Sequence, residues 1–218
     1  MKKALKIRLL VALVATTCFV NAQTYRLEVG YNNPQRGGSQ VSSTFFQGIK
    51  LGGSAEFEYK NNFSLLTGVL YNVAYSDKLQ GYPNSATVTY KTLGHFLDIP
   101  LRINYTYPIS KSLKIFGFAG PNINIGLAQN MEITSTQTYN PANPSQATYY
   151  VKPGKFNSYA DSDYLLNRIN IQLGAGAGVQ WKKFQIKGGY DFGLNNLNKA
   201  GSDNIYQKGW YALAAYQF

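Results

Sequence analysis

The stretch LGHFLDIPLRINYTY, residues Leu93–Tyr107, alternates between two kinds of side chain. Its odd positions carry uncharged and mostly apolar side chains, whereas Asp98 and Arg102 occupy even positions. Period-two alternation is typical of a β-strand whose two faces meet different environments. This stretch therefore predicts a long strand with one uncharged face and one ionic face.

The same alternation recurs along the chain, which favours an all-β fold. Tyr, Phe and Gly are abundant at 18, 12 and 21 residues, and only 14% of the 218 residues are charged, which also suits strands better than helices. The predicted strands are Thr24–Asn32, Phe45–Lys60, Phe63–Ser76, Thr87–Tyr107, Leu113–Ala128, Leu165–Lys182, Phe184–Leu194 and Lys208–Phe218.

The connections between these strands alternate in length. Three are short, namely Asn61-Asn62, Pro108–Ser112 and Lys182-Lys183. The others are long, namely Asn33–Thr44, Asp77–Ala86, Gln129–Tyr164 and Asn195–Gln207. An eight-stranded antiparallel up-and-down barrel would place every short turn at one end, an asymmetry that is typical of outer-membrane barrels.

Residues 1–22 have the features of a secretory signal peptide. Lys2, Lys3, Lys6 and Arg8 precede the apolar run Leu9–Val20, and a V-x-A site ends at Ala22. The run has about 12 residues, whereas a spanning helix needs ~20, so we expect cleavage and a barrel domain over residues 23–218. Acylation of Cys18 is the alternative, but the residues before it depart from the lipoprotein pattern.

The charge distribution argues against a nucleic-acid partner. Removing the four cations of the signal lowers the formal net charge from +11 to +7. The remaining Lys and Arg residues are scattered and form no nucleic-acid-binding motif.

The uncharged face could point into lipid or into the dry cavity of a soluble, lipocalin-like barrel. Aromatic residues of this face gather in two groups, and two aromatic belts around an aliphatic band favour lipid. The group at the short-turn end comprises Tyr25, Tyr59, Phe63, Tyr105, Tyr107, Trp181, Phe184 and Phe218; the group toward the long loops comprises Tyr31, Phe45, Tyr71, Tyr75, Phe192 and Trp210.

The opposite face is rich in Gly and Asn and carries nearly balanced charges, which suits a narrow lumen. Because uncompensated buried charge is costly, we expect these side chains to form an internal ionic network. With Phe116 and Phe118 also directed inward, the lumen should be plugged. The predicted ionic network comprises Arg26, Glu28, Lys50, Glu56, Glu58, Asp98, Arg102, Lys114, Arg168, Lys187 and Asp191.

Three segments carry a resemblance to a known family, namely HFLDIPLRINY at His95–Tyr105, FGFAGPNINI at Phe116–Ile125, and Trp210–Phe218. The chain resembles the small outer-membrane β-barrel proteins of Bacteroidetes, the PorT-like group. The resemblance implies location in the cell outer membrane, with lipid around the barrel. The terminal aromatic on an alternating last strand is similar to the signal read by the barrel assembly machinery. Such families share architecture more than activity.

No catalytic, cofactor or metal site is predicted. A lipid-modifying enzyme, acting on lipid A or phospholipid, would need a nucleophile beside His95, the only histidine, which lies on the uncharged face. No Ser of that face lies at a matching height on the neighbouring strands. A single His, with no Cys after Cys18, also offers no metal cluster.

The long connection Gln129–Tyr164 is the strongest candidate for function, because loops of this length are usually functional or disordered. Met131–Thr138 and Ala147–Lys152 alternate as if they continued the flanking strands as a hairpin. Its tyrosines either bind a protein or glycan partner or pack the hairpin together. The barrel would then have a structural or partner-binding role, of which one form is an accessory subunit of an outer-membrane complex. The candidate contact residues are Tyr139, Tyr149, Tyr150 and Tyr159.

Overall fold

The computed structural model describes residues 24–38, 43–81, 87–135, 153–160, 165–199 and 203–218, so the predicted signal peptide lies outside the described residues. Among the described residues we find no helix that is long and apolar enough to cross a membrane. The strands are β1 (Thr24–Gly37), β2 (Thr44–Phe45), β3 (Gln47–Glu58), β4 (Phe63–Gly81), β5 (Thr87–Pro108), β6 (Leu113–Ser135), β7 (Gly154–Asn157), β8 (Ile169–Trp181), β9 (Phe184–Gly193) and β10 (Tyr206–Gln217).

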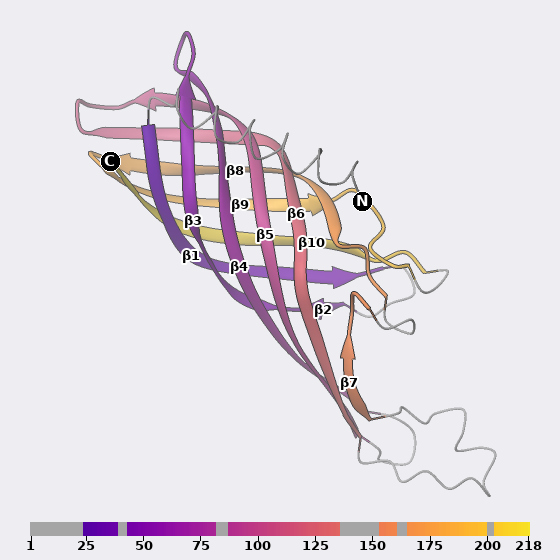
Figure 1. The fold of residues 1–218 in the computed structure, drawn as a ribbon. Helices are drawn as coiled ribbons and strands as arrows, with labels where there is room; N and C mark the ends of the chain where they lie inside the picture. Colours follow the sequence, from indigo (N-terminus) through magenta and orange to yellow (C-terminus); the bar gives the residue numbers. More distant parts are fainter. Residues whose placement is uncertain (1–23, 39–42, 82–86, 136–152, 161–164, 200–202) are drawn as a thin grey trace, which may run out of the picture.

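Eight of these strands form a closed antiparallel ring in the order β1-β3-β4-β5-β6-β8-β9-β10 (Figure 1). The ring closes where β10 pairs with β1, from Arg26↔Gln217 to Gly37↔Tyr206. The short strands β2 and β7 pair with β1 and β6 at the long-loop end. The predicted eight-stranded up-and-down barrel is confirmed.

The tight turns have backbone conformations that hairpins require. Asn61 and Asn62 adopt φ values of 60° and 67° between β3 and β4, and Lys182 adopts 54° between β8 and β9. Asn tolerates this left-handed region better than most residues, because its side chain can hydrogen-bond locally. These turns and Phe218, whose amide donates to the Tyr25 carbonyl over 3.1 Å, share one end of the barrel.

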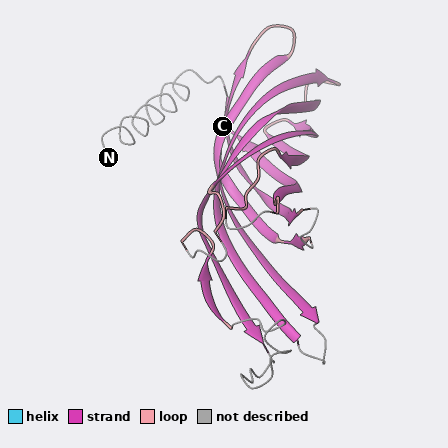
Figure 2. Ribbon diagram, turned by 90° about the vertical axis from the view of Figure 1, so that its right-hand side faces the viewer, coloured by secondary structure: helices cyan, strands magenta, loops and turns pink. Residues whose placement is uncertain are grey.

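Four strand boundaries differ from the prediction by more than two residues, and the first is the end of β1, which lies at Gly37 and not at Asn32. β4 continues to Gly81 and β6 to Ser135, past the predicted ends at Ser76 and Ala128. Ladder pairing continues there although the outward side chains become polar, so the apolar outward face, the signal used for prediction, stops before the strands do. Figure 2 shows the longest strands extending past the others. β8 begins at Ile169, and residue 166 makes only an isolated bridge to Asn198.

The predicted hairpin above the barrel is present in part. Met131–Ser135 continues β6, and β7 returns antiparallel to it from Ile133↔Gly154 to Asn130↔Asn157. The predicted return segment 147–152 lies outside the described residues.

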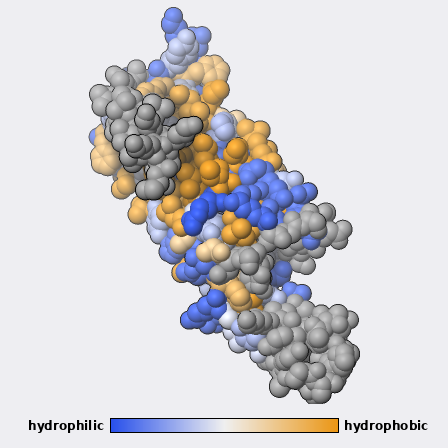
Figure 3. Space-filling model, turned by 45° about the vertical axis from the view of Figure 1, so that its right-hand side comes forward, coloured by the Kyte–Doolittle hydropathy of each residue, from blue (hydrophilic) through white to orange (hydrophobic). Residues whose placement is uncertain are grey.

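The apolar face of the barrel points outward. The side chains of Ile186 and Ile49 are 70% and 65% exposed, whereas Glu28 and Asp98 are 1% and 3% exposed. Figure 3 shows apolar side chains gathered over the barrel wall. A soluble, lipocalin-like barrel needs the opposite arrangement, so that alternative is wrong.

Aromatic pairs mark both edges of the apolar band. At the short-turn end, the ring centroids of Phe63 and Tyr105 lie 5.0 Å apart. At the long-loop end, those of Tyr31 and Trp210 lie 5.3 Å apart. Rings at these two heights match the interfacial girdles of transmembrane barrels.

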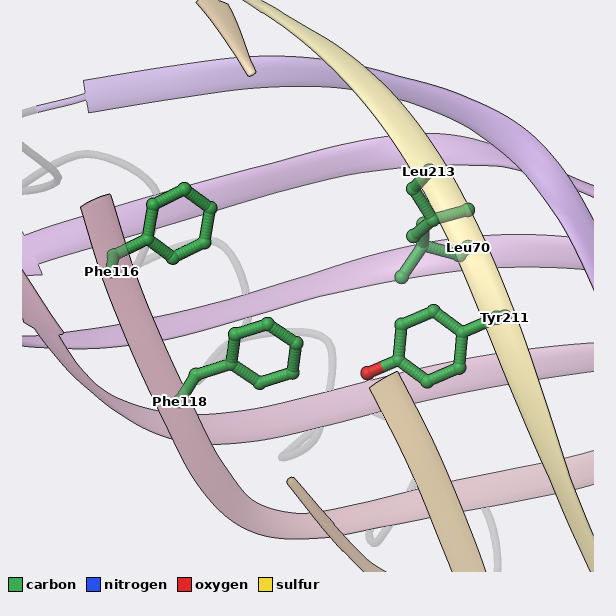
Figure 4. Packing of buried hydrophobic residues seen from close by; sticks show 5 residues of the cluster. All are labelled: Leu70, Phe116, Phe118, Tyr211 and Leu213. Carbon is green, nitrogen blue, oxygen red and sulfur yellow. The ribbon is translucent and has the colours of Figure 1, made fainter. Parts of the chain in front are cut away.

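An apolar plug fills the middle of the lumen. Phe116 and Phe118 extend inward from β6 toward side chains of β4 and β10, and their ring centroids lie 6.3 Å apart (Figure 4). This plug comprises Leu70, Phe116, Phe118, Tyr211 and Leu213.

Candidate functional site

Four ion pairs cross the described part of the lumen, and every side chain in them is less than a tenth exposed. Arg26 pairs with Glu56. The nitrogen–oxygen distance is 3.1 Å for Lys50–Asp98, 2.5 Å for Arg102–Asp191 and 2.8 Å for Lys187–Glu28.

These pairs form a closed circuit of strands. The first joins β1 to β3, the second β3 to β5, the third β5 to β9, and the fourth returns from β9 to β1. Each of these four strands contributes one cation and one carboxylate. We call this set the ion-pair circuit. Because no member is left without a counter-charge, the circuit can be buried without an isolated charge.

Hydrogen bonds satisfy further oxygen atoms of the circuit. Asp98 Oδ1 accepts from Asn122 over 3.0 Å and from Asn124 over 2.9 Å. Arg102 also donates to the carbonyls of Gly120 and Gly174. Amides on neighbouring strands thus fix the carboxylates in place, which explains why Asn is frequent on this face.

Gly120 is the one glycine of the described chain with positive φ, at 151°. A Cβ atom at this position would also collide with the Leu101 carbonyl of β5. Glycine is therefore required where β6 brings its carbonyl to Arg102.

Three residues of the predicted network lie outside these pairs. Glu58 is exposed at the short-turn end, and Lys114 is half-buried nearby. Arg168 is exposed at the opposite end and donates to the carbonyls of Gly126 and Leu127 over 3.1 and 2.9 Å. All three lie at strand ends, where water can replace an ionic partner.

A second polar cluster closes the long-loop end of the lumen. The buried guanidinium of Arg36 lies 5.1 Å from the ring centroid of Phe46 and 5.3 Å from that of Phe96. Its Nε donates to Gln207 Oε1 over 2.7 Å, and its Nη1 donates to Gln129 Oε1. We call these five residues the arginine cap.

Sequence reasoning missed the arginine cap. Arg36 belongs to Asn33–Thr44, which we predicted as a long connection after a strand that ends at Asn32. The parity of β1 was an available signal, because Arg36 shares the even face of Arg26 and Glu28.

Tyr159 lies against the arginine cap. It is half-buried, and the Arg168 guanidinium lies 4.6 Å from its ring centroid. Burial raises the pKa of its phenol, although Arg36 and Arg168 oppose this shift. The other three candidate contact residues, Tyr139, Tyr149 and Tyr150, lie outside the described residues.

The space inside the barrel is unevenly distributed. The two cavities in the middle of the lumen measure about 30 and 20 Å³, enough for single waters. A cavity of about 350 Å³ opens at the short-turn end, bounded by Arg26, Glu56, Lys114, Gln180 and Gln217. We call it the vestibule. The narrow middle prevents these cavities from forming a wide channel.

His95 faces outward and makes a polar contact with a neighbouring strand. Its Nδ1 lies 2.6 Å from the Tyr71 hydroxyl, and the two rings are stacked with centroids 6.0 Å apart. Val73 is its cross-strand partner on β4, and Ala128 is its partner on β6. Neither partner is a nucleophile. Within the described residues, no group of three His, Cys, Asp or Glu side chains could hold a metal ion.

A family profile described as "Outer membrane protein beta-barrel domain" matches residues 16–199, which is most of the chain. A search of curated proteins gives no match.

Solved structures with similar folds include three bacterial barrels. Ail of Yersinia pestis, in complex with the heparin analogue sucrose octasulfate, is 14% identical with a TM-score of 0.40, over 89% of this chain and 98% of Ail. Neisserial surface protein A is 10% identical with a TM-score of 0.40, over 89% and 97%. The outer membrane enzyme PagL is 11% identical with a TM-score of 0.39, over 87% and 98%.

Proposed function

Because this chain belongs to the outer membrane protein beta-barrel domain family and is an outer-membrane protein, we propose that it is a non-enzymatic barrel that binds a partner outside the cell. The observation that carries the proposal is the unequal length of its strands. β4, β5 and β6 continue beyond the other strands as a sheet (Figure 2). In outer-membrane barrels, the end with long loops is extracellular.

This sheet extension consists of Ser76–Gly81, Thr87–Thr92, Met131–Ser135 and β7. β6 runs ten residues past Ile125↔Ile169, its last pair with β8. At about 3.3 Å per residue, that is ~33 Å of strand, of which the five residues Met131–Ser135 of the extension account for about 17 Å. A paired sheet of this length holds side chains at fixed positions well beyond the lipid.

The outward face of the extension is polar, whereas the barrel wall below it is apolar. Asp77 on β4 and Lys91 on β5 are exposed directly beyond the apolar Tyr75 and Leu93. Glu132 on β6 lies 3.9 Å from Lys155 on β7, and both are exposed. A rigid surface of mixed charges with the exposed Leu79 suits recognition of a protein or glycan.

The filled lumen supports a role other than transport. Its middle cavities of about 30 and 20 Å³ admit single waters and no larger solute. In planar bilayers we expect no large, stable single-channel steps. Such steps would contradict the closed lumen.

The surroundings of His95 support a role other than catalysis. Its polar neighbour is the Tyr71 hydroxyl, and no serine accompanies it on the outward face of the described strands beside it. We expect His95→Ala to leave lipid A and phospholipid unchanged by mass spectrometry. A changed lipid profile would favour a lipid-modifying enzyme instead.

Site-specific photo-crosslinking tests partner binding. A photoreactive residue at Leu79 reports on the sheet extension, where this side chain is 70% exposed. The matched control is Ile49, which is exposed on the lipid-facing wall. We expect adducts with an extracellular protein or glycan from position 79 and lipid adducts from position 49. The same adducts at both positions would contradict a role of the extension.

Two finer assignments are part of this proposal. Membership of the PorT-like group of Bacteroidetes, with a role as an accessory subunit of a larger outer-membrane complex, is supported by the motif His95–Tyr105. Recognition by the barrel assembly machinery is supported by the outward aromatics of β10, Trp210 and Tyr216. Structural reinforcement of the envelope is the outcome if no partner is found.

A further inference from the structure

The vestibule contains a buried cation whose hydrogen-bonding capacity is only partly used. Arg26 is 5% exposed and pairs with Glu56. Its Nε and Nη1 atoms are buried and have no hydrogen-bond partner. Leaving charged donors unpaired is costly, so such atoms in a native structure require an explanation.

Arg26, the residue that carries the unpaired donors, lines a cavity large enough for a ligand. The vestibule has a volume of about 350 Å³, within the range of small-molecule sites, and Arg26 is one of its lining residues. The half-buried Lys114 lines the same cavity from β6. Two cations on different strands therefore border one space, together with the carboxylates of Glu56 and Glu58.

The carboxylate beside Arg26 has no oxygen left for the two unpaired donors of the guanidinium. Glu56 Oε1 accepts from Asn104 Nδ2 over 2.7 Å and from the Ser64 hydroxyl, and its Oε2 is paired with Arg26. Both oxygens are thus occupied by protein donors. The guanidinium retains capacity that Glu56 cannot fill.

The rim of the vestibule is basic. The three short turns contain Lys60, Lys111, Lys182 and Lys183, all exposed, while Glu58 is the exposed acid of the described strand ends there. Lys182 lies 5.0 Å from the ring centroid of Trp181. A mouth with this charge raises the local concentration of anions.

We propose that the vestibule binds a small oxyanion, carried as a carboxylate or phosphate group on a polar molecule that enters from the periplasm. Arg26 donates through Nε and Nη1, and Lys114 supplies the second positive charge. Thr24, Thr106 and Gln217 offer hydroxyl and amide groups to the rest of the molecule. The partly used guanidinium is then a binding group at the end of the ion-pair circuit.

Calorimetric titration of the full chain, refolded in detergent micelles, tests this proposal. Inorganic phosphate and succinate serve as separate probes and distinguish a phosphate site from a carboxylate site. We expect saturable binding of at least one probe in the millimolar range, weakened by added salt. No saturation by either probe would overturn the proposal.

Substitutions then locate the site. Lys114→Gln should weaken binding about tenfold, as expected for the loss of one charge-assisted hydrogen bond. The matched control is Lys111→Gln, which removes an exposed lysine of the adjacent turn that does not line the vestibule. Equal weakening by both variants would show a diffuse rim effect and overturn the site.

Arg26 itself needs a conservative variant, because its removal leaves Glu56 unpaired. Arg26→Lys keeps the charge but has no planar fork of donors. We expect it to fold, as judged by the heat-dependent gel shift of a barrel, and to bind the probe at least tenfold more weakly. Unchanged affinity in a folded Arg26→Lys variant would overturn the role of the guanidinium.

Discussion

The two ends of the lumen bury the same side chain in different ways. At the extracellular end, Arg36 is enclosed by two rings and donates to the side-chain oxygens of Gln129 and Gln207. At the periplasmic end, Arg26 has one carboxylate partner and two unused donors beside a cavity of about 350 Å³. A buried arginine whose donors are taken up by neutral acceptors can thus close the lumen. A buried arginine with unused donors beside a cavity can instead bind a ligand.

This difference implies an asymmetric barrel, sealed toward the outside and accessible from the periplasm. Between the ends lie the apolar plug and the ion pairs of the narrow middle, where the cavities have room for single waters only. We therefore expect that removing an ionic contact lowers the free energy of unfolding less when the contact lies nearer the vestibule.

The largest loss of stability is expected for the ion pairs in the narrow middle of the lumen. Asp191→Ala leaves Arg102 buried without its carboxylate and should lower the free energy of unfolding by about 3–5 kcal/mol. Glu56→Ala should lower it by only about 1–2 kcal/mol, because removal of this lining carboxylate lets water of the vestibule reach Arg26. Urea unfolding in lipid vesicles, followed by Trp fluorescence, measures both. Equal losses of stability in the two variants would contradict a difference between the narrow middle of the lumen and the vestibule.

Loss of the arginine cap should have the next largest effect. Arg36→Met keeps an apolar side chain between Phe46 and Phe96 but leaves the Gln129 and Gln207 oxygens without their donor. We expect a loss of roughly 2–3 kcal/mol by the same measurement. Arg36→Lys should recover part of it, because one ammonium retains the charge over the rings. If Arg36→Met were as stable as the parent chain, the cap would not be a seal.

A substitution in β6 tests how tightly its strand approaches β5. Gly120→Ala should cost roughly 1–3 kcal/mol, because φ at this position is 151° and a Cβ would meet the Leu101 carbonyl. Gly117→Ala is the matched control on the same strand, where the nearest atom to a Cβ would be 3.8 Å away. We expect the control to be nearly neutral; a similar loss in both would point to general intolerance of β6.

The smallest effect concerns Tyr159 and alkaline pH. Because burial raises the pKa of this phenol above the ordinary value of 10.0, the folded state keeps its proton when the unfolded state loses it. Stability from this group is complete below pH 10 and declines as the pH rises through the folded pKa. Tyr159→Phe should therefore be less sensitive than the parent chain above pH 10, by under ~1 kcal/mol, in paired unfolding curves. Parallel curves would contradict the raised pKa.

Much of the barrel could be predicted because alternation records which solvent each face meets. The stretch around Asp98 and Arg102 fixed the inward parity of β5, and the same logic placed Phe116 and Phe118 in the lumen. Strand ends beyond the lipid could not be predicted in this way. There the outward face is polar as well, as at Asp77 and Lys91, so pairing continues after the apolar outward face has ended.

The pattern of pairing also exceeded what parity can predict. Parity places Arg26 and Glu28 on the same inward face, but strand tilt and register decide that Arg26 pairs with Glu56 and Glu28 with Lys187. The arginine cap was missed because the predicted strand stopped at Asn32, whereas the alternation of β1 continues to Gly37. Proline is tolerated in β1 near its end, where the Pro34 carbonyl still accepts from the Phe46 amide over 2.8 Å.

The ion-pair circuit has a consequence for how the barrel is assembled. Lys187 and Glu28 are 159 residues apart and meet only when the last strands reach the first one. Until then, Glu28 on the edge strand β1 and Lys187 on β9, next to the edge strand β10, cannot pair with each other. Their opposite charges attract the edges toward each other, and a sheet that failed to close would hold both charges unpaired in lipid. Closure of the barrel therefore pairs the last two charges of the circuit as well as the last two strand edges.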